Sequence, residues 1–244
     1  MKIALIGYGK MGKAIETIAL ERGHEIVAKI TSSTPLETLK SIEVDVAIEF
    51  TRPDAAVANI TFCLENGIPV VVGTTAWQDH LSAMIQLTEQ QNGALLHASN
   101  FSVGVNIFFE INKLLAKLMK PQIDYIPSIE ETHHLQKLDA PSGTAVTLAK
   151  DILTYTGMNS WKLGEEEQPL VNEDELAIIS YRKPDVPGTH IIKYQSEIDT
   201  IEIKHEAHNR KGFALGAVLA AEYLCDKKGI YSMADVLNIN HHSL

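Results

Sequence analysis

The chain has 244 residues, of which 45% are hydrophobic and 21% are charged, and its formal net charge is −10 at pH 7. This composition is that of an ordinary globular protein with a sizeable core, arranged as one large domain or two modest ones, and it excludes wholesale disorder. The acidic balance argues against a non-specific nucleic-acid binder, because such proteins need basic surface against phosphate. It still permits an anionic small molecule where cationic side chains converge on one pocket.

The two cysteines, Cys63 and Cys225, are too few for a disulfide framework and indicate a reducing compartment. Both lie among apolar neighbours on expected helices, so we interpret them as core residues. The apolar run at the amino terminus is too short for a secretory signal, and no stretch approaches the roughly 18 apolar residues of a membrane span. We therefore expect a soluble, cytoplasmic protein.

The first hundred residues alternate short apolar runs with segments of helical periodicity, which is typical of a parallel α/β sheet. Thr51 and Asp54 resemble a capping box at the start of the helix after the third strand, with Pro53 in its first turn. Repeated β-α winding of this kind predicts a Rossmann-like, doubly wound parallel sheet. The expected strands are 2–6, 26–30, 44–50, 70–72 and 94–97.

The pattern changes after Asn100, where a long helix is expected at 103–119 and is followed by several strands. Consecutive strands of this kind predict a second, α+β domain with a mixed sheet, and Pro127 predicts an edge position or an interruption. The acidic segment 164–174 is expected to be a solvated loop, and small residues at 213–224 predict a closely packed helix. We expect a dinucleotide-binding domain at 1–104 and 211–244, and a substrate-binding and oligomerisation domain at 105–210. The expected strands of this second domain are 125–131, 177–181, 190–194 and 200–207.

A glycine-rich turn directly follows the first strand and directly precedes the first helix. It matches G-x-G-x-x-G, in which the first glycine permits a tight turn, the second admits the pyrophosphate and the third allows close helix packing. The helix amino terminus then faces the phosphates. A glycine turn that only connects strand to helix is the alternative, and the β-α units that follow favour a dinucleotide site. The residues of this turn are Gly7, Tyr8, Gly9, Lys10, Met11 and Gly12.

The end of the second strand lacks the acidic residue that often holds the ribose hydroxyls of the cofactor. Thr31 and Ser32 stand there instead, with Lys29 nearby. Hydroxyls and a lysine would tolerate a 2′-phosphate, so the sequence favours NADPH, alone or together with NADH. An exposed loop without any cofactor contact is the alternative.

Two further loops follow the fourth and fifth strands, where ligands of open α/β sheets bind. Each could be an ordinary turn, but their shared location favours contact with the nicotinamide side of the cofactor. These loops contain Gly73, Thr74, Thr75, Ala98, Ser99, Asn100 and Phe101.

The segment ETHHLQKLDAPSGTA, residues 131–145, carries the most chemical information in the chain. His133 and Lys137 provide positive charge and proton-transfer groups. Ser142 is a natural N-cap, and the amides of Gly143 and Thr144 would be free to bind a carboxylate. A reduction needs these features together, namely anchors for substrate anions and a source of protons.

Three other interpretations compete for this segment. The paired histidines His133 and His134 suggest metal ligands, but no third ligand stands at the usual spacing. The segment could instead be a polar surface loop, or one histidine could be a structural core residue. His205 and His208 also suggest a metal site, but we interpret them as polar residues near a subunit or domain surface, and we expect no metal.

The motif E-x-H-H-x-x-K-x-D-A-P-S-G-T-A resembles the signature of the 4-hydroxy-tetrahydrodipicolinate reductase (dihydrodipicolinate reductase) family. The resemblance covers nearly the whole chain, including the glycine turn, residues 50–53, residues 73–75, residues 100–106 and the helix from Phe213. In many members an acid ends the second strand where Thr31 stands here. Pro184 replaces the first glycine of a usual R-x-G-x-x-x-G-x-H pattern.

The resemblance implies a role for each matching residue and an assembly. His133 would be the proton donor/acceptor and Lys137 the proton donor, while His134, Gly143 and Thr144 would bind a dicarboxylate substrate. Gly7 to Gly12, Gly73 to Thr75 and Ala98 to Phe101 would contact NADPH or NADH. The family also implies a homotetramer built through the second domain.

The resulting hypothesis is an enzyme of lysine and diaminopimelate biosynthesis that reduces 4-hydroxy-tetrahydrodipicolinate, via dihydrodipicolinate, to tetrahydrodipicolinate. It requires the dinucleotide cradle to bring its nicotinamide against His133 and Lys137. Another NAD(P)-dependent small-molecule dehydrogenase on the same scaffold is one alternative. A non-catalytic nucleotide-sensing protein is another, but it would not need Lys137, His133 and the Gly-Thr turn together.

Overall fold

The computed structural model describes residues 1–164, 175–209 and 211–239. The chain divides into two compact units, Met1–Asn106 with Lys211–Leu244 and Ile107–Arg210. The predicted loop 164–174 begins on the last residue of a strand and otherwise lies outside the described residues. None of the helices in the described ranges has the length and apolar character needed to cross a lipid bilayer.

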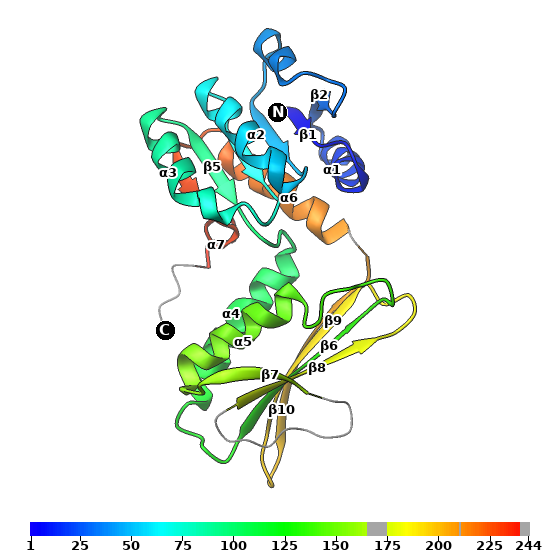
Figure 1. Ribbon diagram of the computed structural model, residues 1–244, viewed down its shortest axis with the longest axis vertical. Helices are drawn as coiled ribbons and strands as arrows, with labels where there is room; N and C mark the ends of the chain where they lie inside the picture. Colours follow the sequence, from blue (N-terminus) through cyan, green and yellow to red (C-terminus); the bar gives the residue numbers. More distant parts are fainter. Residues whose placement is uncertain (165–174, 210, 240–244) are drawn as a thin grey trace. The chain divides into compact units, whose positions relative to one another are not determined.

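The first unit contains a six-stranded sheet in the order β11-β5-β4-β3-β1-β2, in which all neighbours are parallel (Figure 1). The predicted Rossmann-like sheet is thus confirmed. Its sixth strand had not been expected from the sequence. The strands are β1 (Lys2–Ile6), β2 (Glu25–Ile30), β3 (Val46–Glu49), β4 (Val70–Val72), β5 (Ala94–His97) and β11 (Gly229–Tyr231).

Helices cover both faces of this sheet because successive strand residues are apolar on both sides. Ile3 and Leu5 pack against one set of helices, whereas Ala4 and Ile6 pack against the other. The first face is covered by α1 (Lys10–Glu21), α6 (Lys211–Leu224) and α7 (Met233–Val236), and the second by α2 (Pro53–Glu65) and α3 (Leu81–Gln90). Two 3₁₀ helices, η1 (Leu36–Ser41) and η2 (Gln78–His80), complete the unit.

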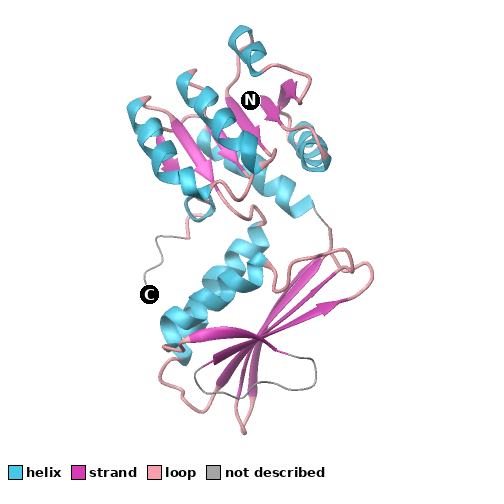
Figure 2. Ribbon diagram, viewed as in Figure 1, coloured by secondary structure: helices cyan, strands magenta, loops and turns pink. Residues whose placement is uncertain are grey.

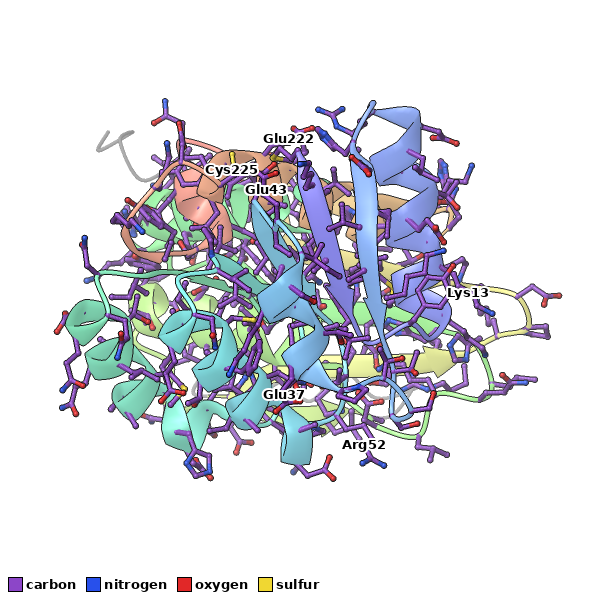
Figure 3. All side chains as sticks on the ribbon, turned by 90° about the horizontal axis from the view of Figure 1, so that it is seen from above. Lys13, Glu37, Glu43, Arg52, Glu222 and Cys225 are labelled. Atoms are coloured by element: carbon purple, nitrogen blue, oxygen red, sulfur yellow. The ribbon has the colours of Figure 1, made fainter. Side chains whose placement is uncertain are left out.

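Helix α6 packs as closely as its small residues predict. A Cβ atom on Gly216 would lie 1.7 Å from the carbonyl oxygen of Phe101. Near the carboxyl-terminal end of the helix, the carboxylate of Glu222 accepts hydrogen bonds from Nε and Nη2 of Arg22, each at 2.8 Å. Glu222 also lies near Cys225 (Figure 3). Cys225 is partly buried against the core of this unit but follows the last helical residue, so its predicted place on a helix was wrong, whereas Cys63 is fully buried on α2.

The predicted capping box at Thr51 was also wrong. The N-cap of α2 is Arg52, and the hydroxyl of Thr51 instead donates to the buried carboxylate of Glu49. Asp54 pairs with the guanidinium of Arg52 at 3.1 Å, and Figure 3 shows Arg52 at the surface. A buried carboxylate two residues earlier, at the end of β3, therefore competes for the hydroxyl that the sequence pattern assigned to the helix.

The second unit is a five-stranded mixed sheet in the order β10-β9-β6-β8-β7, as predicted for an α+β domain (Figure 2). Strand β6 is parallel to β8 and antiparallel to β9. One face packs against two helices, with Ile129, Ile178 and Ile192 of the sheet in a core with Leu148 of α5. The elements are α4 (Val103–Met119), β6 (Ile126–His133), α5 (Gly143–Thr156), β7 (Ser160–Gly164), β8 (Glu175–Arg182), β9 (Gly188–Gln195) and β10 (Thr200–Ala207).

Strand β6 is central, which contradicts the edge position predicted from Pro127. Pro127 pairs with Tyr194 of β9, but pairing with β8 begins only at Ser128. The missing N–H therefore lies where the strand has one neighbour, and no ladder bond to β8 is lost. The strand also runs two residues further than expected, so that His133 is its last residue.

Candidate active site

The glycine turn leaves the two outer glycines packed and the middle one open. Gly7 has φ +96°, and a Cβ there would lie 2.0 Å from the carbonyl oxygen of Phe50, while one on Gly12 would lie 2.3 Å from the carbonyl oxygen of Gly7. Gly9 would meet no atom within 4 Å. It precedes α1, whose first amides lack partners within the helix and favour an anion. This geometry fits a dinucleotide pyrophosphate.

The other loops predicted to hold cofactor lie at the same edge of the sheet. The chain turns in opposite directions from β1 and β3, and such a switch point is where open α/β sheets bind ligands. The amide of Thr51 donates to Oγ1 of Thr74 at 2.7 Å, which ties the loop after β3 to the loop after β4. A Cβ on Gly73 would lie 2.1 Å from the ring of Phe50, whose centroid is 5.6 Å from that of Phe101. Of the remaining predicted residues, Lys10, Thr75 and Ser99 are exposed, Tyr8, Met11 and Ala98 are partly buried, and Asn100 accepts the amide of Ser102 at 2.8 Å.

The end of β2 differs from its expected role in one respect. Nζ of Lys29 lies 2.6 Å from Oε1 of Glu16 and 4.7 Å from the ring centroid of Tyr8, so its charge is already paired. The hydroxyls remain clustered, with Oγ1 of Thr31 at 2.9 Å from Oγ of Ser33. Thr31 and the adjacent Ser32 are both exposed.

A polar row crosses the covered face of the second sheet, next to the apolar row of its core. The strand register pairs Glu131 with His190 on one side and with Ser180 on the other, and His190 with His205. Directly paired residues point to the same face, so these four side chains lie side by side. His205 is half-buried and its ring centroid is 5.9 Å from that of Phe108. His208 is exposed, and the place of both histidines near a subunit or domain surface stays a prediction.

Glu131 is the buried carboxylate of this row, with no solvent exposure. Its Oε2 contacts Nδ1 of His133, two residues along the same strand and on the same face, and its Oε1 accepts from Nη1 of Arg182 at 3.1 Å. Burial alone would raise the pKa of Glu131. Hydrogen bonds from His133 and Ser180 and the nearby charges of His133 and Arg182 lower this pKa to about 2.

His133 is enclosed on two sides by residues of β9. Its ring lies edge-on to that of His190, with centroids 5.1 Å apart. Gly188 leaves room for its other nitrogen, since a Cβ at that position would lie 3.0 Å from Nε2. Burial, followed by the charge of His133, lowers the pKa of His190 to about 3, so His190 is neutral at physiological pH.

The amino-terminal end of α5 has the predicted anion-binding form. Ser142 is its N-cap and accepts the amide of Ala145 at 3.2 Å. Gly143 and Thr144 are the first two helical residues, so their amides have no acceptor within the helix. His134 is partly buried, and no hydrogen-bond partner for its Nδ1 occurs in the described part of the chain.

Lys137 lies on the loop between β6 and α5. Its Nζ is 2.7 and 2.8 Å from the two carboxylate oxygens of Asp139, and hydrogen bonding to Lys137 lowers the pKa of Asp139. Arg182, at the end of β8, donates to the carbonyl oxygens of Lys137 at 3.3 Å and Asp139 at 2.6 Å. The same guanidinium donates to Glu131, which contacts His133, so His133 and the loop of Lys137 are joined through the side chains of Glu131 and Arg182.

Comparison with known proteins decides the family. Residues 1–101 match the model of "Dihydrodipicolinate reductase, N-terminus" and residues 104–237 match "Dihydrodipicolinate reductase, C-terminus". The chain belongs to the dihydrodipicolinate reductase family. The expected activity, NAD(P)H-dependent reduction of 4-hydroxy-tetrahydrodipicolinate in lysine and diaminopimelate biosynthesis, is confirmed at the level of this family.

Relatives match along nearly their whole length. The 4-hydroxy-tetrahydrodipicolinate reductase of Christiangramia forsetii is 51% identical over 98% of this chain and 98% of its own, and that of Methanosarcina barkeri is 40% identical over 86% and 80%. Among solved structures, the dipicolinate-bound dihydrodipicolinate reductase from Paenisporosarcina sp. TG-14 has a TM-score of 0.78 at 25% identity. That match covers 96% of this chain and 98% of the other.

The chain also contains a trio that sequence spacing had not suggested. Ligand atoms of Glu131, His133 and His190 all lie within 4.8 Å of one another. Arg182 already neutralises Glu131, and a cation here would stand beside a guanidinium, so the arrangement favours a proton-transfer network over a metal site. The absence of a metal stays a prediction.

Sequence reasoning gave Glu131, Arg182, Gly188 and His190 no part in the site. A signal existed for Glu131, because strand alternation from His133 places it on the same face. Arg182, Gly188 and His190 are the matching residues of the R-x-G-x-x-x-G-x-H pattern, which was visible in the sequence but was given no role in the site. Its members in fact surround His133.

Proposed function

We propose that His133 and Lys137 are the proton-transferring residues of the family's reduction and that the amino-terminal end of α5 holds the substrate. One observation carries this proposal. Arg182 joins His133, through Glu131, to the loop of Lys137, and Ser142 joins the end of α5 to the same sheet through His190. Proton donors and an anion site thus belong to one connected arrangement.

The substrate side suits a planar dicarboxylate. The amides of Gly143 and Thr144 at the positive end of α5 would bind one carboxylate, and His134 and Lys137 would supply charge and hydrogen bonds to the other. The solved relative from Paenisporosarcina binds dipicolinate, which is such a dicarboxylate. This similarity supports the same class of ligand here.

Residues of the chain would then stabilise charge and transfer protons during the reduction. When bound at the glycine turn and the loops that contain Gly73 and Phe101, the nicotinamide supplies the hydride. Hydride would add to C4 of the unsaturated ring formed by loss of the 4-hydroxyl group, and the electrons of the conjugated N=C–C=C system would shift to give an enamine anion. The ammonium group of Lys137, supported by His133, would protonate C5 of that anion, which restores the C=N bond and completes the reduction of the C=C bond.

NADPH is the proposed preferred cofactor. Thr31 and Ser32 stand where a carboxylate would repel a 2′-phosphate, and the hydroxyl of Ser33 lies beside that of Thr31. The ammonium group of Lys29 is paired with Glu16, so Lys29 would attract the 2′-phosphate through long-range charge and not through a direct ion pair. Comparing kcat/KM for NADPH and NADH tests this preference, and a higher value for NADH would overturn it.

We also propose a homotetramer in the cytoplasm. Helix α4 exposes a stripe of large apolar side chains at helical spacing, which is typical of a protein interface. Both cysteines are free thiols, as a reducing compartment requires. Light scattering after gel filtration would give the subunit count. The stripe consists of Ile107, Ile111, Leu114 and Leu118.

The main test supplies enzymatically generated substrate and follows cofactor absorbance. His133→Ala and Lys137→Ala should each lower kcat by about 10²–10⁴, the usual effect of removing a general acid or base. Cofactor affinity, measured by fluorescence titration, should stay within a few-fold. His80→Ala and Lys150→Ala, both at exposed positions, serve as matched controls. Wild-type turnover in both site variants would refute the assignment.

A further inference from the structure

We propose that Glu131 and Arg182 act together as positioning residues for both proton-transferring groups. Glu131 would fix the ring tautomer of His133, and Arg182 would fix the loop that carries Lys137. The inference rests on the proposed function of His133 and Lys137, and it assigns a function to two residues that so far serve only as a structural link between them.

The contacts of Glu131 determine which nitrogen of His133 carries the proton. An ionised carboxylate only accepts hydrogen bonds, and its two oxygens here have different partners, Nδ1 of His133 and Nη1 of Arg182. Nδ1 must therefore be the protonated nitrogen of the neutral ring. Nε2 is left without a proton and becomes the atom that takes up or returns one.

Burial makes this constraint strong. Glu131 has no solvent exposure and the side chain of His133 is 11% exposed, so water cannot replace either partner easily. A buried carboxylate that lost one donor would pay the full desolvation cost of that group. The tautomer is thus tied to the fold of the sheet, because β6 alternation places both side chains on one face.

Arg182 fixes the backbone of the loop that contains Lys137. Its Nε and Nη2 donate to the carbonyl oxygens of Lys137 and Asp139, while Nη1 donates to Glu131 and to the carbonyl oxygen of Tyr181 at 2.7 Å. A planar guanidinium can serve acceptors in several directions, which a lysine ammonium on a flexible stem cannot do as rigidly. Asp139, held in this way, in turn holds Nζ of Lys137.

The tautomer of His133 in Glu131→Gln distinguishes a positioning role of Glu131 from a purely structural one. In Glu131→Gln the amide offers one acceptor and one donor, so it cannot accept from both Arg182 and His133. Because the guanidinium stays charged, we expect the amide oxygen to face Arg182 and the NH₂ group to face Nδ1. His133 should then change to the Nε2–H tautomer.

The experiment combines ring-nitrogen NMR with steady-state kinetics on the full-length enzyme. Long-range ¹H–¹⁵N correlation spectra of His133, assigned by comparison with His133→Gln, should show Nδ1–H in the wild type and Nε2–H in Glu131→Gln. We expect kcat to fall by about 10²–10⁴, since an acid-to-amide change that gives the wrong histidine tautomer has an effect of about 10⁴ in serine proteases. KM for the substrate should change much less than kcat. An unchanged tautomer with wild-type kcat would overturn the role of Glu131.

Arg182→Lys provides the second arm and covers the case in which Glu131→Gln does not fold. It keeps the charge beside Glu131 but cannot serve all the acceptors, so we expect lower kcat together with faster hydrogen exchange of backbone amides in residues 134–141. Wild-type kcat and exchange would refute the role of Arg182.

Glu130→Gln is the matched control, because Glu130 is the neighbouring strand residue, points to the opposite face and pairs with Lys193 at 2.6 Å. If His133→Ala and Lys137→Ala retain turnover, the proposed function fails; if they lose it while Glu131→Gln and Arg182→Lys do not, only this inference fails.

Discussion

Oγ of Ser142 lies 3.0 Å from Nε2 of His190, and this contact joins the amino-terminal end of α5 to the sheet that carries His133. Ser142 is also the N-cap of α5, and its hydroxyl oxygen accepts the amide of Ala145. One buried hydroxyl therefore caps the start of the helix and fixes the position of the amides that we propose as the anion-binding group. The proposed substrate anchor and the proposed proton-transfer group are connected through the neutral ring of His190.

Ser142→Ala should affect both stability and substrate binding. Loss of an N-cap costs about 0.5–2 kcal/mol in the free energy of unfolding, and the variant also leaves Nε2 of His190 without its partner. Because the end of α5 is then less well held, we expect KM for the dicarboxylate substrate to rise several-fold. Denaturant unfolding and steady-state kinetics measure the two effects.

Ser232→Ala is the control for this substitution, since Ser232 caps α7 in the other unit and forms a capping box with Asp235. It should lower stability without raising KM for the substrate. Equal rises in KM for both variants would show that the effect of Ser142→Ala is only a loss of stability.

The pKa of His190 predicts a specific dependence of stability on pH. An unfolded histidine titrates near 6.5 and folded His190 near 3, so between these values the unfolded chain binds more protons than the folded one. The contribution of His190 to the free energy of unfolding is therefore complete above pH 6.5 and is lost as the pH falls toward 3. Over this range the free energy of unfolding falls by up to about 1.4 kcal/mol per pH unit.

His190→Gln removes this titration while keeping a polar group beside Ser142. The difference in unfolding free energy between wild type and variant should shrink as the pH falls from 6.5 to about 4. Urea unfolding at several pH values measures it. A difference that stays constant over this range would contradict the assignment of a neutral, buried His190.

The sequence was informative where chemistry depends on neighbours in the chain, and uninformative where it depends on strand register. The glycine turn, the Ser142 cap and the small-residue face of α6 follow from local patterns, and the structure has them as predicted. The pairing of Glu131 with His190, 59 positions later, depends on which strands meet and in what register. No local pattern specifies that register, and so the row of polar residues around His133 had to come from the structure.

Gly188→Ala tests the space beside His133. The added Cβ would lie 3.0 Å from Nε2 and 3.2 Å from Cδ2 of that ring, so the ring must shift by a few tenths of an ångström from the position in which it contacts Glu131. We expect kcat to fall by at least ten-fold, because a displaced proton-transfer group loses its geometry. Gly164→Ala is the matched control on the same sheet, where the new Cβ would make an ordinary 3.6 Å contact with Ile179. Similar kcat values for the two alanine variants would argue against a catalytic requirement at Gly188.

Gly216→Ala tests the packing of α6 against the loop that contains Phe101. A Cβ only 1.7 Å from the carbonyl oxygen of Phe101 forces the helix and the loop apart, and overpacking of this kind typically costs about 1–3 kcal/mol or more. Since Phe101 ends a loop proposed to contact the cofactor, KM for NADPH should rise as well.

Gly212→Ala is the control on the same helix, where the new Cβ would lie 3.6 Å from Oγ of Ser102. That variant should be neutral or more stable by at most about 1 kcal/mol, because alanine is the better helix former. Thermal unfolding of the two variants side by side decides the matter, and a Gly216→Ala protein as stable as Gly212→Ala would show that the helix can move away from the loop at little cost.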